Sequence, residues 1–166
     1  NLARTPLAHR SQVYYAGSAA DASAKLVRED VRKPVGADRE RLARATLALN
    51  ASDLNIAPSR VDRTWLYRMI DDRIAEGSSR VIGPEGGLWS KLDYGSQGPG
   101  GAVLEGVFTF PDRRGRGLGA EIVATCMAHE PLPVCLHVAE DNRAARSAYD
   151  RAGMRPVGTC RILLQG

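Results

Sequence analysis

The sequence predicts a single domain of the mixed α and β class. Segments rich in β-branched and aromatic residues alternate along the chain with segments whose apolar residues recur at helical spacing. The length of 166 residues suits one domain, and with only 5% aromatic residues its core should rest on Leu, Val, Ile and Ala. A strand over 102–110, a helix from 118 and a strand over 134–139 follow one another closely, which favours a right-handed parallel crossover.

The beginning of the chain has the weakest pattern. We expect residues 1–24 to form an N-terminal extension, with a remnant of a preceding segment as an alternative because the chain opens at Asn1, and residues 25–166 to form the domain. Inside the extension, 12–15 has the pattern of a short strand, and 25–28 has the pattern of the first strand of the domain.

Two helices are predicted next. The first is capped by Asp38 and ends near Asn50, and the second begins at Ser59, where Asp62 three residues later resembles a capping box, and ends at Gly77. The apolar face expected for the second helix consists of Val61, Trp65, Leu66, Met69, Ile70 and Ile74.

The second half of the chain has a clearer order. Segments 80–82 and 88–94 read as a hairpin, and 95–101 reads as a glycine-rich loop that leads into the strand at 102–110. After the crossover, 142–152 reads as a helix and 155–164 as a closing strand.

Composition narrows the functional classes. The net charge is +4, but acidic residues are spread among the basic ones, so a solvated surface is favoured and no nucleic-acid partner is expected. Cys126, Cys135 and Cys160 are widely separated in apolar surroundings, which argues for reduced thiols in the cytoplasm and against a disulfide framework or a metal site. No apolar run approaches the ~20 residues of a membrane span, so no membrane partner is expected.

The most informative segment is 111–120, which lies between the strand at 102–110 and the following helix. Glycines at such a turn let the backbone approach a phosphate, and the first N–H groups and the dipole of the helix favour its negative charge. The segment contains Arg113, Arg114, Gly115, Arg116, Gly117 and Gly119, and Arg143 and Arg146 add charge further along. This pattern predicts an anion-binding cradle.

Two kinds of nucleotide site can be compared with this cradle. A P-loop requires a lysine after its last glycine, and Gly119 is followed by Ala120. A dinucleotide fingerprint fits better, since Gly115 and Gly117 precede Ala120 at the right spacing and Glu140 lies about 20 residues on. That unit normally opens a fold with several more βα repeats, however, and little chain follows Glu140.

A third pattern covers more of the chain. Its motifs are Thr109-x-Pro111, Arg114-x-x-Gly117-x-Gly119 and Asn142-x-x-Ala145-x-x-x-Tyr149-x-x-x-Gly153. Together they resemble the acetyl-CoA-binding core of the GNAT superfamily of N-acetyltransferases over residues 102–158. Met154 is a departure, because the family commonly has phenylalanine there.

The resemblance implies the GNAT fold: a central mixed, largely antiparallel sheet with a parallel, splayed strand pair, flanked by helices. It also implies acetyl-CoA as cosubstrate and direct transfer of its acetyl group to a primary amine. The implied cofactor-binding residues are Val107, Phe108, Thr109, Arg114, Gly115, Arg116, Gly117, Leu118, Gly119, Ala120, Asn142 and Arg146. For Asn142, capping of the helix alone explains the residue equally well.

The resemblance and the chemistry of the reaction together suggest two catalytic residues. Tyr149 is the candidate general acid, because a phenol can protonate a departing thiolate; the alternative is a tyrosine packed in the core. Glu105 is the candidate general base, since it shares the parity of Val107 and Thr109 on an apolar strand; the alternative is a solvent-facing glutamate. Asp93 and Tyr94, in the neighbouring strand, are further candidates for the same work or for holding a cationic acceptor.

Several alternatives remain open at this stage. His129 and His137 are expected to be structural. The amine acceptor is not specified by any motif, and a homodimer is an open alternative to a monomer. A non-catalytic acyl-CoA-sensing module and, with less support, a dinucleotide-binding oxidoreductase are the competing functions.

Overall fold

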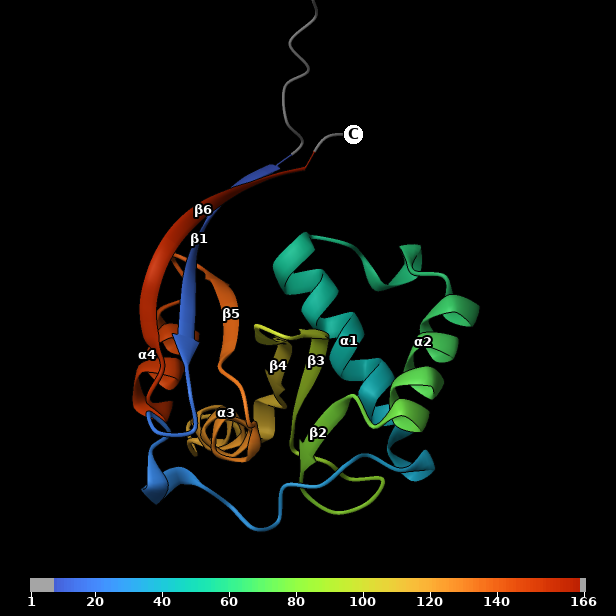
Figure 1. The fold of residues 1–166 in the computed structure, drawn as a ribbon. Helices are drawn as coiled ribbons and strands as arrows, with labels where there is room; N and C mark the ends of the chain where they lie inside the picture. The colour runs from blue at the N-terminus through green and yellow to red at the C-terminus, as the bar shows by residue number, and fades with distance from the viewer. Residues whose placement is uncertain (1–7, 165–166) are drawn as a thin grey trace, which may run out of the picture.

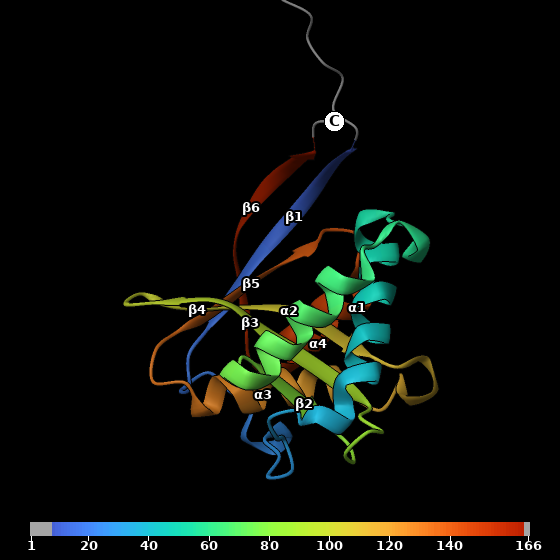
Figure 2. The same cartoon turned by 90° about the vertical axis from the view of Figure 1, so that its right-hand side faces the viewer.

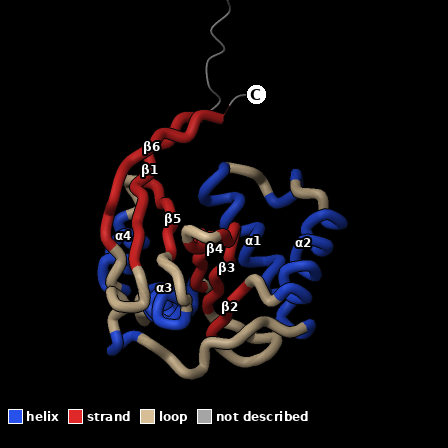
Figure 3. The backbone as a smooth tube through the Cα atoms, in the orientation of Figure 1, coloured by secondary structure: helices blue, strands red, loops and turns tan. Residues whose placement is uncertain are grey.

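The computed structural model describes the backbone of residues 8–164 and consists of one six-stranded mixed sheet with helices on both faces (Figures 1 and 3). The strand order is β2-β3-β4-β5-β1-β6. The elements are β1 (Ala8–Gly17), α1 (Arg39–Leu54), α2 (Arg63–Glu76), β2 (Ser79–Ile82), β3 (Ser90–Gly98), β4 (Gly101–Thr109), α3 (Leu118–His129), β5 (Val134–Ala139), α4 (Arg143–Ala152) and β6 (Arg155–Leu164).

The two faces of the sheet carry separate cores. One core packs α3 and α4 against the sheet and includes Tyr15, Leu104 and Ile122, whereas the other packs α1 and α2 against β2 and β4 and includes Leu66 and Phe108. Figure 2 shows α1 and α2 in front of the strands. Burial of each large apolar side chain stabilises the fold by about 1.5–3 kcal/mol.

The predicted crossover is confirmed, and its two strands then separate. β4 and β5 are parallel neighbours, but they pair only at Ala102 with Val134 and at Val103 with Cys135. Beyond these pairs the backbone groups that each strand turns toward the other have no ladder partner. The sheet is therefore open between β4 and β5, and every other strand pair is antiparallel.

The N-terminal prediction was wrong for the part that the structure describes. Residues 8–17 form β1, which lies between β5 and β6 in the sheet and is no extension of it, whereas residues 1–7 lie outside the described residues. The segment 25–28 is not a strand: Ala24–Leu26 is a 3-10 turn, and an isolated bridge follows at Arg32.

Local details of the helices and of β3 also differ from prediction. The buried Asp38 does not cap α1, because its carboxylate accepts from Arg32 and from the N–H groups of Val35 and Gly86, and α1 continues to Leu54. α2 begins at Arg63, with Asp62 accepting from the N–H groups of Thr64 and Trp65. Trp65, predicted on the apolar face, is 57% exposed.

The predicted loop at 95–101 is mostly the end of β3. None of the described helices is long and apolar enough to cross a membrane.

Candidate active site

The predicted cradle lies where β4 leads into α3. After a 3-10 turn at Pro111–Arg113, the backbone has φ of +75° at Gly115 and +85° at Gly117, and α3 begins at Leu118. Side-chain-bearing residues rarely adopt such φ values, so both glycines are required by the path of the chain. A Cβ at Gly115 would meet nothing within 4 Å, so the conformation and not crowding selects glycine there.

This turn presents a run of free backbone donors. The carbonyl of Gly117 accepts from the N–H groups of Ala120 and Glu121, at 2.9 and 3.0 Å, which closes the first turn of α3. Among the described residues, no acceptor is found for the N–H groups of residues 115–119. The N–H groups of Arg114 and Ala120 bond to Pro111 and Gly117, so the predicted cradle narrows to 115–119.

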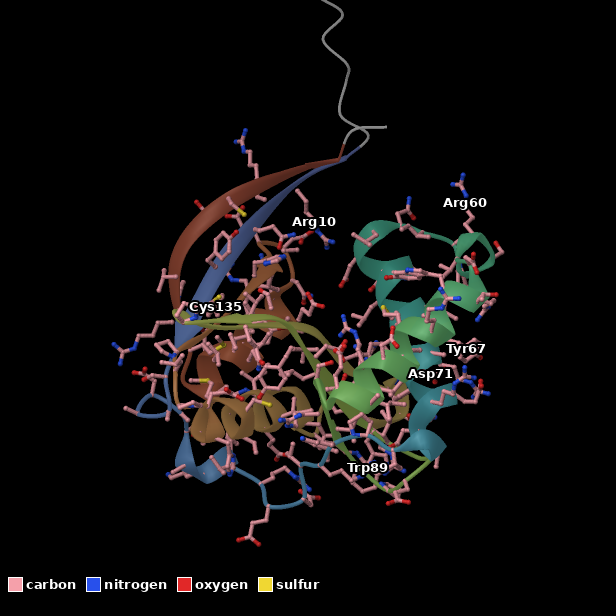
Figure 4. The ribbon with its side chains drawn as sticks, turned by 45° about the vertical axis from the view of Figure 1, so that its right-hand side comes forward. Arg10, Arg60, Tyr67, Asp71, Trp89 and Cys135 are labelled. Carbon is pink, nitrogen blue, oxygen red and sulfur yellow. The ribbon has the colours of Figure 1, made fainter. Side chains whose placement is uncertain are left out.

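The arginine side chains of the cradle differ in whether they already contact other residues of the protein. Arg113 stacks over the ring of Trp89, with its guanidinium carbon 4.8 Å from the ring centroid, and Arg114 Nε donates to the carbonyl of Thr109 at 3.1 Å. Trp89 is labelled in Figure 4. Arg116 is exposed and has no partner among the described side chains. Arg116 is thus the arginine best available to an anion held by the free N–H groups.

A bulge in β4 changes which side of the sheet its side chains face. Gly106 has φ of +57°, and the β3–β4 register shifts between Lys91 and Asp93. Before the bulge, Glu105 points to α2; after it, Val107 packs on the α3 side. Thr109 lies on that side too, since its Oγ1 would be 4.0 Å from a Cβ at Gly119. The prediction that Glu105 shares the face of Val107 and Thr109 was therefore wrong. The side chain of Phe108 is buried toward α1 and α2, which leaves only its backbone for a ligand.

Tyr149 lies on α4, on the α3 side of the sheet. It is 7% exposed, and its ring makes an edge contact with Tyr15 at 5.8 Å between centroids. Burial raises the pKa of Tyr149 well above its usual value, and the nearby Asp53 and Tyr15 add to this. The phenol is thus protonated at neutral pH, and its hydroxyl has no hydrogen-bond partner among the described residues.

The last turn of α1 is bonded to β1. Arg10 of β1 reaches toward α1 in Figure 4, and its Nη1 donates to the carbonyl of Asp53 at 2.8 Å. Arg10 Nη2 also lies 3.9 Å from Asp141, in the turn between β5 and α4. β1, α1 and the β5–α4 turn are therefore tied together.

The other predicted residues of α4 have contacts within the protein. Asn142 caps α4, with its Oδ1 accepting from the N–H of Ala145 at 3.1 Å. Arg146 donates from Nη1 to the carbonyl of Glu140 at 3.0 Å, and its Nε lies 3.5 Å from the hydroxyl of Tyr15. For both residues, contact with acetyl-CoA stays a prediction.

Glu105 belongs to a cluster of charges between α2 and the sheet. Arg73 Nη2 lies 2.8 Å from Glu105 Oε1, and Arg73 Nη1 lies 2.7 Å from Asp93 Oδ2. Burial lowers the pKa of Arg73, but the two carboxylates raise it more, so the guanidinium stays charged. Lys91, 2% exposed, also pairs with Asp93. Sequence reasoning did not identify Arg73 or Lys91, although Lys91 and Asp93 share a face of a strand-like segment.

The remaining candidates lie elsewhere. Tyr94 faces α3, where burial and the nearby Cys126 and Glu130 raise its pKa above the usual value. His129 Nδ1 is 2.8 Å from the carbonyl oxygen of Thr125, and the ring of His137 contacts that of Tyr14. For His129 and His137, a structural role stays a prediction.

An open parallel strand pair beside a glycine turn at a helix N-terminus is the arrangement expected of the GNAT class. The sequence model of the Acetyltransferase (GNAT) family matches residues 58–154, more than half of the chain. This protein belongs to the GNAT acetyltransferase family. No protein of curated function matches the sequence.

Solved structures share the fold. An acetyltransferase of the GNAT family from Colwellia psychrerythraea has a TM-score of 0.64 at 15% identity, covering 97% of this chain and 58% of that one. A GNAT-family acetyltransferase from Bacillus cereus has a TM-score of 0.59 at 15% identity, and the match covers 81% of this chain and 95% of that one. A ribosomal-protein-alanine N-acetyltransferase from Brucella melitensis has a TM-score of 0.59 at 18% identity, and the match covers 81% of this chain and 99% of that one. This chain therefore spans just over half of the Colwellia protein but nearly all of the other two.

Proposed function

We propose that this protein is an N-acetyltransferase that moves the acetyl group of acetyl-CoA to a primary amine by direct attack in a ternary complex. The observation that carries the proposal is the opening between β4 and β5 beside a turn whose N–H groups at residues 115–119 are free. The family supports acetyl transfer as the reaction class.

The cradle fits the pyrophosphate of acetyl-CoA. Successive free N–H groups at the N-terminus of the 12-residue helix α3 favour an anion through hydrogen bonds and through the helix dipole. Arg116 adds a charge, and a Cβ at Gly115 or Gly117 would meet no atom closer than 3.8 Å, so the turn is uncrowded. The backbone of β4 at Val107 and the N–H of Thr109, whose carbonyl accepts from Arg114, are unpaired toward β5 and can bond the pantetheine arm and polarise the thioester carbonyl.

The acid and base candidates suit a direct transfer because they belong to opposite faces of the sheet. Acetyl-CoA supplies an activated acyl group with a thiolate leaving group. A carboxylate on the α2 side, Glu105, can take the proton that the attacking amine must lose. A protonated phenol on the α4 side, Tyr149, can give a proton to the departing sulfur.

The sheet topology argues against the competing hypothesis of a dinucleotide-binding oxidoreductase. A dinucleotide-binding domain needs a sheet of several parallel strands, and β4–β5 is the single parallel pair among the described strands. The sensing module differs from the proposed enzyme only in turnover, so turnover is the quantity to measure.

The test is release of free CoA from acetyl-CoA, followed with a thiol reagent, in the presence of a panel of primary amines. The panel includes small-molecule amines, aminoglycosides and peptides with a free N-terminus or a lysine. We expect amine-dependent CoA release by the wild-type protein and a loss of about tenfold or more with Tyr149→Phe. Tight binding of acetyl-CoA without amine-dependent release across the panel would contradict the enzyme and favour the sensing module.

A further inference from the structure

Four charged side chains meet between α2 and the inner strands of the sheet. Lys91 and Asp93 come from β3, Glu105 from β4 and Arg73 from α2. Ser79 of β2 adds a hydrogen bond from its hydroxyl to Asp93 Oδ1 at 2.7 Å. Two positive and two negative groups balance, as a buried cluster requires.

Two glycines in β3 and β4 leave the space that the charged side chains occupy. A Cβ at Gly106 would lie 2.7 Å from both Asp93 Oδ2 and Lys91 Nζ, and a Cβ at Gly95 would lie 2.5 Å from Glu105 Oε2. Both distances are shorter than real Cβ contacts. The charged groups therefore fill the space beside the bulge of β4, and glycine at both positions lets them do so.

Within the cluster, the members differ in exposure. The side chains of Lys91 and Asp93 are 2% and 8% exposed, that of Arg73 is 23% exposed and that of Glu105 is 45% exposed. Burial thus increases from Glu105 through Arg73 to Asp93 and Lys91. The guanidinium of Arg73 donates a hydrogen bond to the accessible Glu105 and forms an ion pair, without hydrogen-bond geometry at Nη1, with the buried Asp93.

The bridge leaves one oxygen of Glu105 free. Oε1 accepts from Arg73, whereas no donor to Oε2 is found among the described residues. A half-exposed glutamate would otherwise sample several rotamers at an entropic cost on binding. The planar guanidinium with its fixed fork of donors suits the bridging of two carboxylates in a set geometry, and an ammonium group does not have that geometry.

We propose that Arg73 is a positioning residue: paired with Asp93, which Lys91 and Ser79 also contact, it holds the carboxylate of Glu105 with Oε2 free on the α2 side of the sheet. This inference rests on the proposed function, because it requires Glu105 to take the proton of the amine. It adds the residues that orient the base to a site otherwise described by the cradle and Tyr149.

The experiment is a double-mutant cycle on kcat for amine acetylation, with Arg73→Gln, Glu105→Gln and the double variant. If Arg73 acts through Glu105, each single variant loses about tenfold or more in kcat, and Arg73→Gln costs less than about twofold in the Glu105→Gln background. The KM for acetyl-CoA stays within about twofold of wild type, since the cradle is untouched. Losses that multiply, or an unchanged kcat in Arg73→Gln, would overturn the proposal.

Two further variants separate positioning from stability. Arg73→Lys keeps a positive charge beside Asp93 but lacks the fork, so we expect a folded protein with kcat several-fold below wild type; full activity in this variant would also overturn the proposal. The matched control is Arg39→Gln, which breaks the exposed pair of Arg39 with Asp71 between α1 and α2 and should leave kcat unchanged. If wild type acetylates amines and Glu105→Gln does so equally well, the positioning role fails while acetyl transfer stands.

Discussion

Replacement of Gly106 by alanine tests the bulge on which the geometry of β4 depends. A non-glycine residue in the left-handed region costs about 1–2 kcal/mol, and Gly106 has φ of +57°. The new methyl would also lie 2.7 Å from Lys91 Nζ and Asp93 Oδ2, so the buried pair must shift, and loss of a charge-assisted hydrogen bond costs about 1.5–3 kcal/mol. We expect Gly106→Ala to lower the free energy of unfolding by about 3 kcal/mol, or Tm by about 6–12 °C.

Urea denaturation followed by circular dichroism measures this change, with Gly100→Ala as the matched control. Gly100 lies in the turn between β3 and β4, and a Cβ there would meet nothing within 4 Å. The control should therefore change the free energy of unfolding by less than about 1 kcal/mol. A Gly106→Ala protein as stable as the control would refute the assignment of Gly106 as a strained, crowded bulge.

Three further predictions concern individual side chains. Tyr149→Phe should reduce kcat by about tenfold or more at an unchanged Kd for acetyl-CoA, measured by steady-state kinetics and calorimetry; an equal loss in binding would speak against a proton-donor role. For Asp38, burial raises the pKa but hydrogen bonds from Arg32 and from two backbone N–H groups outweigh it, so the folded pKa is lowered. Its stabilising contribution is therefore present above the unfolded pKa of about 4 and is lost as pH falls through the folded pKa, and Asp38→Asn should flatten the acid branch of stability against pH. Burial raises the pKa of Cys126 to about 11, so iodoacetamide at pH 7.5 should label the partly exposed Cys135 before Cys126 in peptide mass spectra, and equal labelling would contradict the packing of α3.

The sequence predicted those elements whose signals are local. α3, β5, α4 and β6 lie within a residue or two of their predicted positions because each is bounded by a cap, a glycine or a proline beside a periodic apolar segment. The position of β1 was missed, because pairing with β5 and β6 far along the chain places it in the sheet. A pattern of four residues at 12–15 contains no information on its partners.

The candidate site was also predicted only where the sequence signal is local. Gly115 and Gly117 carry a local signal, and the structure gives both the positive φ that their role requires. The face of Glu105 was predicted wrongly because strict alternation was applied through Gly106, although a single glycine inside a strand is a known sign of a bulge. The role of Arg73 depends on the packing of α2 over β3 and β4, which no local pattern specifies.

Calorimetric titration with acetyl-CoA tests the central claim most directly, in wild type and in Gly119→Asp. A Cβ at Gly119 would meet only Thr109 Oγ1 and Ala148 Cβ, both at 4.0 Å, so the variant should fold while placing a carboxylate among the free N–H groups. Gly158→Asp is the control, since nothing lies within 4 Å of a Cβ there. We predict saturable binding of acetyl-CoA to wild type and control, weakened about tenfold or more in Gly119→Asp, and no binding of NADH. Binding of acetyl-CoA that is unaffected by Gly119→Asp, or its absence in wild type, would contradict the assignment of residues 115–119 as the cofactor cradle.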